Sequence, residues 1–224
     1  EMKVLVSVFN NLYTDQRVEK FCKTLHENAY QIEVIGNNWG GTPEMKRPYP
    51  FSRISLQSKK LRFAYLEFQW KLFFELLKKA DRNTILHAND LDALLPNYLV
   101  SKIKGIPLVW DSHEIFTEMP TVTNRWVQHV WRLLENALIR KIKYFITAND
   151  SYANWFETNY KIKRPIVIRN FPQKSESPKN FVENHPKIIL YQGTINYSRG
   201  IDKMIEAMQF IENAEFHIAG RGPF

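Results

Sequence analysis

A short apolar run ends in four consecutive residues that could do chemistry. The run PLVW is followed directly by Asp111, Ser112, His113 and Glu114. A histidine next to two carboxylates is a candidate for chemistry. The same four residues could instead only cap a loop. The tetrapeptide alone does not decide between these two interpretations.

The apolar run itself predicts a buried strand. It follows Gly105, and a short uninterrupted apolar run is typical of a parallel strand that is covered on both faces. Its polar residues would then lie at the carboxyl end of the strand, where open α/β sheets bind their ligands. We therefore take His113 as the first candidate for a catalytic residue.

Composition limits the classes of protein to which the chain can belong. Its 224 residues are 44% hydrophobic, which suffices for one domain and part of a second. Lys and Arg number 31 against 23 Asp and Glu, and this net charge of +8 favours an anionic partner such as a nucleotide diphosphate, anionic lipid or nucleic acid. The single cysteine, Cys22, and the lack of a signal peptide lead us to expect a cytoplasmic protein. No apolar run is long enough to span a membrane, so any membrane contact would be peripheral.

Apolar periodicity predicts strands and helices in alternation through residue 172. Strands are expected near residues 3–9, 31–36, 53–56, 84–88, 107–110, 144–148 and 165–169, with helices near 14–29, 59–79, 91–104, 127–138 and 150–160. This alternation is typical of a doubly wound parallel sheet with helices on both faces. The first loop lacks the GxGxxG sequence, so we expect no nicotinamide or flavin cofactor.

The pattern changes after residue 172. Residues 173–186 are polar and lack apolar periodicity, which predicts a linker. A strand (187–191), a loop (193–199), a helix (200–210) and a strand (215–219) follow. This second α/β unit is too small to bury a core of its own. We predict a complete α/β domain over residues 1–172 and an incomplete one over residues 187–224.

The predicted helix over residues 59–79 combines aromatic and basic side chains. It carries six Lys or Arg against two Glu, together with Phe63, Tyr65, Phe68, Trp70, Phe73 and Phe74. One interpretation is a core helix whose exposed side is basic. The other is that part of this surface contacts the inner leaflet of a membrane or a lipid-linked substrate.

Seven segments occur in a fixed order along the chain: DQRVEKF, LHANDLDALLPNY, WDSHEIFTEMP, ITANDS, VIRNFP, YQGTINYSRGIDKMIEAM and FHIAGRGPF. Together they make the chain similar to the family 4 glycosyltransferases of the two-domain GT-B architecture. The resemblance implies a Rossmann-like acceptor-binding domain over residues 1–172. It implies that residues 187–224 begin a Rossmann-like domain that binds a nucleotide sugar.

The resemblance also implies donor contacts in the second domain. In this family a basic residue directly before the glycine that opens the first donor-domain helix binds the diphosphate, and here these two residues are Arg199 and Gly200. Backbone amides of Gly193, Thr194 and Gly200 would add support. Arg199 could also be a solvated surface residue, although a cation at a helix N-terminus is unfavourable without an anionic partner. A second basic residue common in the family is replaced by Thr194.

In the first domain, the resemblance makes His113 the histidine that contacts the donor sugar or its phosphates. It implies acceptor contacts for Asn10, Asn11, Asp90, Asp111 and Glu114. Asp111 and Glu114 could instead orient the imidazole or cap the loop. Asn10 and Asn11 replace glycines found in many relatives, which leaves phosphate contacts from this loop open.

The implied activity is that of a retaining glycosyltransferase. It would move a sugar from a nucleotide-diphosphate sugar to a glycan or lipid-linked acceptor, at the inner face of the plasma membrane, in cell-envelope or capsular polysaccharide synthesis. We expect no obligatory metal, because arginine and a helix dipole can neutralise the diphosphate. The paired glutamates that hold the donor in this family would lie beyond Phe224, so we expect the 224-residue chain alone to be inactive.

Two alternatives stay open from the sequence. A nucleotide-sugar epimerase or hydrolase of the same fold would need a carboxylate acid and base pair, for which only Asp111 and Glu114 are available locally. A non-enzymatic module could bind a polyanion through its basic helices. An RNP-like aromatic strand, a KH loop and zinc-ligand spacing are all missing from the sequence, so we do not expect nucleic acid as the partner.

Overall fold

A computed structural model describes residues 2–39, 41–119, 122–123, 125–172, 174 and 186–222. The chain forms two compact units, Glu1–Phe171 and Pro172–Phe224. This division lies one residue from the predicted boundary at 172, and the acceptor and donor roles assigned to the two parts stay predictions. Most of the predicted linker, residues 173–186, lies outside the described residues.

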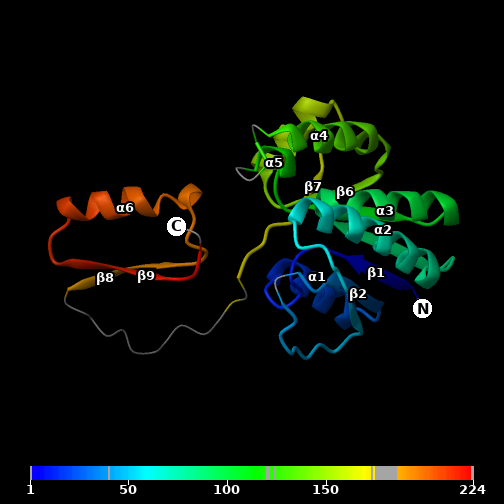
Figure 1. Ribbon diagram of the computed structural model, residues 1–224, viewed down its shortest axis with the longest axis horizontal. Helices are drawn as coiled ribbons and strands as arrows, with labels where there is room; N and C mark the ends of the chain where they lie inside the picture. The colour runs from blue at the N-terminus through cyan, green and yellow to red at the C-terminus, as the bar shows by residue number, and fades with distance from the viewer. Residues whose placement is uncertain are drawn as a thin grey trace. The chain divides into compact units, whose positions relative to one another are not determined.

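The first unit is built on a fully parallel seven-stranded sheet (Figure 1). Its strands are β1 (Lys3–Ser7), β2 (Gln31–Asn37), β3 (Phe51–Ile54), β4 (Thr84–Asn89), β5 (Leu108–Ser112), β6 (Tyr144–Thr147) and β7 (Ile166–Val167). Their spatial order is β3-β2-β1-β4-β5-β6-β7, which is the order of a doubly wound Rossmann-like sheet with one further strand. The predicted α/β class is confirmed. The order reverses between β1 and β4, and ligands of such sheets bind at the carboxyl ends of the strands beside this point.

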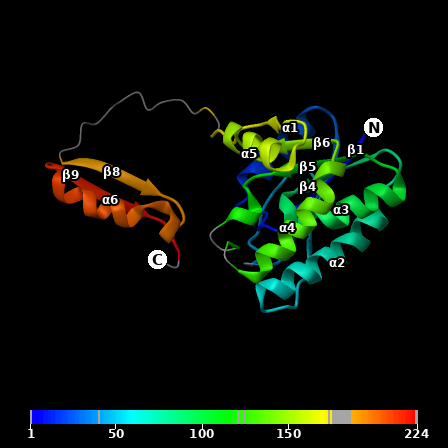
Figure 2. The ribbon, with the colours of Figure 1, turned by 90° about the horizontal axis from the view of Figure 1, so that it is seen from above.

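Helices cover both faces of this sheet. They are α1 (Gln16–Glu27), α2 (Leu61–Lys79), α3 (Asp90–Lys104), α4 (Trp126–Leu138) and α5 (Asp150–Tyr160), with 3-10 turns η1 (Phe116–Glu118) and η2 (Ile139–Lys141). Figure 2 shows α1 on one side of the sheet and α2, α3 and α4 on the other. Two buried clusters correspond to these two sides. The smaller one packs α1 against β1 and β2, and the larger one packs α2, α3, α4 and α5 against the sheet.

Packing in the larger cluster holds the end of β5 in place. Trp110 is fully buried and stacks on Phe145 of β6 at 4.3 Å between ring centroids, while Phe156 of α5 meets both rings edge-on. Offset-stacked and edge-on aromatic contacts stabilise a core beyond the area that they bury. The residues that follow Trp110 therefore leave a rigid strand, and a rigid strand positions their side chains.

Two strand boundaries differ from those predicted. The β3 strand ends at Ile54, because the N–H group of Leu56 donates to the side-chain oxygen of Asn38 and no longer to the neighbouring strand. The β7 strand has only two residues, because the carbonyl oxygen of Ile168 accepts from the Arg17 side chain. Side-chain hydrogen bonds of this kind compete with the ladder of a sheet.

The second unit is a single β-α-β unit. It consists of β8 (Lys187–Gln192), η3 (Tyr197–Arg199), α6 (Ile201–Ala207), η4 (Met208–Phe210) and β9 (Ala214–Ala219), and β8 pairs with β9 in parallel. Large apolar residues such as Leu190 and Phe210 are exposed, which fits a unit too small to enclose a core. The α6 helix ends at Ala207, three residues before its predicted end, and the chain continues as a 3-10 turn.

Within the described ranges, none of the helices combines the length and the apolar character needed to cross a membrane.

Candidate functional site

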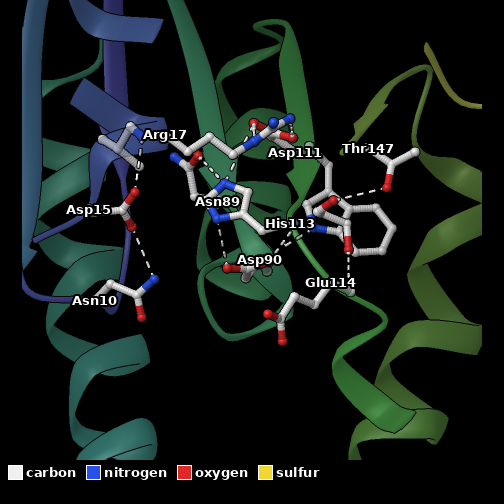
Figure 3. A network of polar contacts seen from close by, with 12 residues as sticks. Asn10, Asp15, Arg17, Asn89, Asp90, Asp111, His113, Glu114 and Thr147 are labelled. Carbon is white, nitrogen blue, oxygen red and sulfur yellow. Dashed lines mark hydrogen bonds and ion pairs between the residues drawn. The ribbon is translucent and has the colours of Figure 1, made fainter. Parts of the chain in front are cut away.

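Three loops meet at the carboxyl ends of β1, β4 and β5. The loop after β1 leads to Asp15, β4 ends at Asn89, and β5 ends at Ser112, one residue before His113. Because β4 lies between β1 and β5 in the sheet, residues from all three loops can interact. Figure 3 shows the polar network that they form.

His113 lies at the centre of this network. Its Nδ1 atom is 3.2 Å from a carboxylate oxygen of Asp90, and its Nε2 atom is 3.1 Å from the amide oxygen of Asn89. The Nε2 atom is also 3.6 Å from Asp111. The backbone N–H of His113 donates to Asp90 at 2.8 Å. Both ring nitrogens face acceptors, an arrangement that suits a doubly protonated imidazolium.

Arg17 holds the carboxylate of Asp111 in place. The guanidinium donates to both carboxylate oxygens, from Nε at 3.0 Å and from Nη2 at 2.7 Å, and a third bond runs from Nη1 to the carbonyl oxygen of Ile168 at 2.7 Å. Arg17 and Asp111 are both buried, so this is a two-pronged ion pair removed from water. The pair ties α1 to the end of β5 and to the segment after β7. It places Asp111 where the carboxylate can orient the His113 ring.

Asp90 has a left-handed backbone conformation. Its φ angle is +60°, in the left-handed region that residues other than glycine rarely adopt. The buried Trp110 indole donates to the Asp90 carbonyl oxygen at 3.2 Å, and His113 binds the side chain. Such strained residues persist where the surroundings hold them, and they occur often at functional sites.

The charges of the network shift the pKa values of its members. Burial alone would lower the pKa of His113, but the negative charges of Asp90 and Asp111 outweigh burial and raise the pKa to about 9. Burial raises the pKa of Asp90 to about 6 against the attraction of His113. Burial also opposes ionisation of Asp111, yet the hydrogen bonds from His113 and Arg17 hold the pKa of Asp111 below its ordinary value. An imidazolium flanked by carboxylates therefore exists from about pH 6 to about pH 9.

This protonation state decides what His113 can do. A histidine that is positive at neutral pH, with both nitrogens directed at acceptors, is not a general base. It can present a fixed positive charge, or donate a proton, to a group on which negative charge develops. The site is thus suited to a reaction with an anionic leaving group.

The other residues predicted for the first unit lie at the margin of this network or outside it. Asn10 donates to Asp15 at 3.0 Å, and Asp15 caps the N-terminus of α1. Asn11 accepts from the N–H of Tyr13 and stabilises its own loop. The Glu114 side chain is exposed, and its carboxylate lies outside the contacts drawn in Figure 3. Acceptor contacts for these residues stay predictions.

The first turn of α3, directly after β4, carries two aspartates in an Asp-x-Asp arrangement, Asp90 and Asp92, which the sequence interpretation overlooked. Asp92 is buried, one of its carboxylate oxygens has no hydrogen-bond partner, and burial raises its pKa well above the ordinary value. Burial therefore disfavours the charged form of this carboxyl group. Among the described residues, no group of three or more His, Cys, Asp or Glu side chains could hold a metal ion. The independence from metal expected above stays a prediction.

In the second unit, the predicted donor-binding residues follow β8. The N–H of Gly193 already donates to the carbonyl oxygen of Ala219 at 3.0 Å, so the amide support expected from Gly193 is engaged elsewhere. The carbonyl oxygen of Thr194 accepts from the Tyr191 hydroxyl at 2.6 Å. Arg199 is exposed, and Gly200 has a φ angle of +69°, which favours glycine. The donor-binding roles of these residues stay predictions.

A family model identifies the chain. Residues 15–171 match the model of Glycosyltransferase Family 4, and the matched segment includes Arg17, Asn89, Asp90, Asp111 and His113. The chain belongs to this family. The resemblance found in the sequence is confirmed. No curated protein sequence matches the chain.

Solved structures of other glycosyltransferases share the fold of this family 4 chain. Sucrose-phosphate synthase from Thermosynechococcus elongatus superposes with a TM-score of 0.71 at 12% identity, over 98% of this chain and 62% of its own. The lipopolysaccharide outer core galactosyltransferase WaaB gives 0.62 at 11% identity, over 100% and 62%. UGT89C1 from Arabidopsis thaliana, complexed with UDP-L-rhamnose, gives 0.60 at 11% identity, over 99% and 69%. These likenesses show the GT-B fold, and the chain spans less than two thirds of the first two structures.

Two central members of the network in this family 4 chain were missed from the sequence. Arg17 and Asn89 lie within the segments DQRVEKF and LHANDLDALLPNY, but neither was assigned a role. A signal for Arg17 was available, because a cation in the first turn of a helix is unfavourable unless an anion offsets it. The same reasoning was applied to Arg199. No comparable signal marks Asn89, whose partners Ser7 and His113 are distant in the sequence.

Proposed function

We propose that this chain is part of a glycosyltransferase that moves a sugar from a nucleotide-diphosphate sugar to a glycan or lipid-linked acceptor. The observation that carries the proposal is the His113 imidazolium at the carboxyl edge of the sheet, beside the point where the strand order reverses. Membership of glycosyltransferase family 4 supports the same reaction class. Solved structures of similar fold include a plant enzyme complexed with a nucleotide sugar.

The reaction needs a cation where the leaving group departs. As the bond between the anomeric carbon and the diphosphate oxygen breaks, negative charge grows on the nucleotide diphosphate, and a bond forms from the acceptor hydroxyl oxygen to that carbon. A fixed positive charge in a site shielded from water stabilises this change. His113 would supply this charge. The role of Arg199 in binding the diphosphate is a separate prediction for the second unit.

The protonation state of His113 supports the retaining course that the sequence predicts. An inverting transfer requires a general base that takes the proton of the acceptor hydroxyl. His113 is protonated up to about pH 9 and its nitrogens are engaged, so it does not meet this requirement. In a retaining transfer the departing diphosphate can itself accept that proton. We further propose a role in envelope or capsular polysaccharide assembly at the cytosolic face of the membrane.

An epimerase or hydrolase of the same fold finds less support. That chemistry needs two carboxylates that act as acid and base over the donor. Asp111 is buried and bonded to Arg17 through both oxygens, while Glu114 is exposed and lies outside the network. The two do not form such a pair.

The proposed reaction is tested by transfer assays with a panel of nucleotide sugars and glycan or lipid-linked acceptors. Mass spectrometry detects the glycoside, and proton NMR of the anomeric signal distinguishes retention from inversion. We expect a glycoside of retained configuration from the complete protein that contains this sequence, and none from the 224-residue chain alone. Release of free sugar, or an epimerised nucleotide sugar without any glycoside, would refute the proposal.

A further inference from the structure

Helix α2 has an apolar outer face as well as an apolar inner one. The inner residues Ala64, Phe68, Leu72 and Leu76 are fully buried against the core. The outer row consists of Phe63, Leu66, Trp70 and Phe74, which are 48%, 65%, 68% and 48% exposed. Their spacing of three or four residues places them on one face of the helix. We call these four residues the outer row.

Two aromatic side chains of the outer row contact each other. The rings of Trp70 and Phe74 meet edge-on at 4.9 Å between centroids, and Phe74 also contacts the half-buried Phe73 at 5.2 Å. Single exposed apolar residues are common on proteins, but four large ones on one face of a helix indicate a surface that binds something. A core role explains the inner face of α2 and leaves the outer row unexplained.

Charge around the outer row indicates the kind of partner. The two acidic residues of α2 are neutralised within the helix, Glu67 by Lys71 at 2.7 Å and Glu75 by Lys79 at 3.6 Å. The remaining cations are exposed and form no ion pair within the described part of the chain: Lys59, Lys60, Arg62 and Lys78. Arg62 lies over the ring of Phe63, 4.8 Å from its centroid. An aromatic face bordered by unpaired cations is complementary to anionic lipid, which offers both apolar chains and negative headgroups. A protein groove that is only acidic or only neutral would match one of these two features and not both.

The position of α2 in the fold fits a lipid surface as well. The helix follows β3, and its first turns therefore begin at the same carboxyl edge of the sheet that carries His113. Arg62 in its first turn and Lys59 and Lys60 just before the helix lie at that end. A surface docked there would approach the edge where we expect the acceptor.

We propose that the outer row of α2 docks on an anionic membrane surface. Leu66 and Trp70 enter the interface between headgroups and acyl chains, and Lys59, Lys60 and Arg62 contact lipid phosphates. This inference goes beyond the proposed reaction, because vesicle binding is measured without donor or acceptor. Failure of the vesicle-binding test would therefore leave the proposed reaction intact, and failure of the transfer assay would leave the proposed membrane docking intact.

The docking is tested by flotation with phosphatidylcholine vesicles in which about one third of the lipid is phosphatidylglycerol. We expect the full chain to float at low salt, and to float much less with phosphatidylcholine alone. The double variant Leu66→Gln/Trp70→Gln should lose about tenfold or more in vesicle affinity, because two large apolar side chains no longer enter the interface. Lys59→Glu/Lys60→Glu should lose about tenfold on anionic vesicles, and less when salt is raised.

Matched variants elsewhere separate this surface from general stickiness. Leu133→Gln on α4 changes an equally exposed leucine, and Lys161→Glu/Lys163→Glu reverses two lysines after α5. Both should float like the unchanged chain, and circular dichroism checks that every variant is folded. The proposal is overturned if Leu66→Gln/Trp70→Gln binds vesicles normally, or if the control variants lose as much. It is also overturned if sedimentation shows a lipid-independent dimer that this double variant abolishes, since a second copy of the chain would then cover the outer row.

Discussion

Replacing Asp90 by asparagine removes one negative charge from the network and changes little else. Asparagine tolerates the left-handed backbone of Asp90, whose φ angle is +60°, as well as aspartate does. Its amide oxygen can still accept from the His113 backbone, which now donates at 2.8 Å. The variant therefore isolates the charge of Asp90 as the cause of the unusual protonation of His113.

The size of the effect follows from the geometry. Unit charges at the 3.2 Å separation of His113 Nδ1 and Asp90 attract each other by about 5 kcal/mol at an effective dielectric constant of about 20. Burial of the imidazolium opposes this attraction. The net result is a pKa that rises from 6.5 to about 9, equivalent to about 3 kcal/mol. Without the Asp90 charge, we expect the pKa of His113 to fall to about 7 or lower.

The same shift has a consequence for stability. Because the pKa of His113 is higher in the folded chain than in the unfolded one, protonated His113 stabilises the fold fully below pH 6.5. That stabilisation is lost as the pH rises from 6.5 through about 9. Over this range the unchanged chain should lose up to about 3 kcal/mol of unfolding free energy, and Asp90→Asn should lose much less.

An NMR titration of the histidine rings measures the pKa directly, with the His113 signal assigned from its absence in His113→Gln. Glu114→Gln is the matched control, since it removes a carboxylate next to His113 in sequence but outside the network. We expect this control to leave the pKa of His113 near that of the unchanged chain. The reasoning is refuted if Asp90→Asn shifts the pKa no more than Glu114→Gln does.

Three further predictions concern the residues that support the fold. Arg17→Met should lower the free energy of unfolding by about 3 to 5 kcal/mol in a urea titration, because it leaves the buried Asp111 carboxylate unpaired; Arg17→Lys should recover only part of this loss. Burial raises the pKa of Glu135 to about 7 against hydrogen bonds from Tyr160 and Thr117, so the unchanged chain should lose stability as the pH rises from 4.5 through about 7. Melting curves of Glu135→Gln should lack this loss, and an unaltered pH dependence would contradict it. Gly200→Ala should destabilise α6 by about 1 to 2 kcal/mol, seen as faster amide exchange over Ile201–Ala207.

The fold could be predicted because local patterns determine it. Strand and helix periodicities predicted the seven strands of the first sheet, and the apolar run before Asp111 became β5. Boundaries were wrong where a distant side chain intervened, as at β3, where Asn38 binds the backbone of Leu56, and at β7, where Arg17 binds Ile168. Side-chain to backbone bonds between residues far apart leave no periodic signal in a sequence.

The sequence predicted where the central residues of the network lie, but not which residues hold them in place. The sequence placed His113 and Asp90 at one edge of the sheet, because polar residues at the ends of parallel strands meet there, and their catalytic and acceptor-binding roles stay predictions. The sequence could not show that Asn89 faces His113, or that Arg17 reaches Asp111 across 94 positions of the chain. It also gave no indication that burial and charge leave His113 positive at neutral pH.

The central claim is that the His113 imidazolium stabilises the departing nucleotide diphosphate. Its most direct test is the rate of glycosyl transfer by the complete protein with His113→Ala, compared with His129→Ala, which alters an exposed histidine on α4. We predict that His113→Ala lowers kcat/KM by about 100-fold or more while donor binding changes little, and that His129→Ala has no effect. Transfer at an unchanged rate by a folded His113→Ala variant would contradict the account.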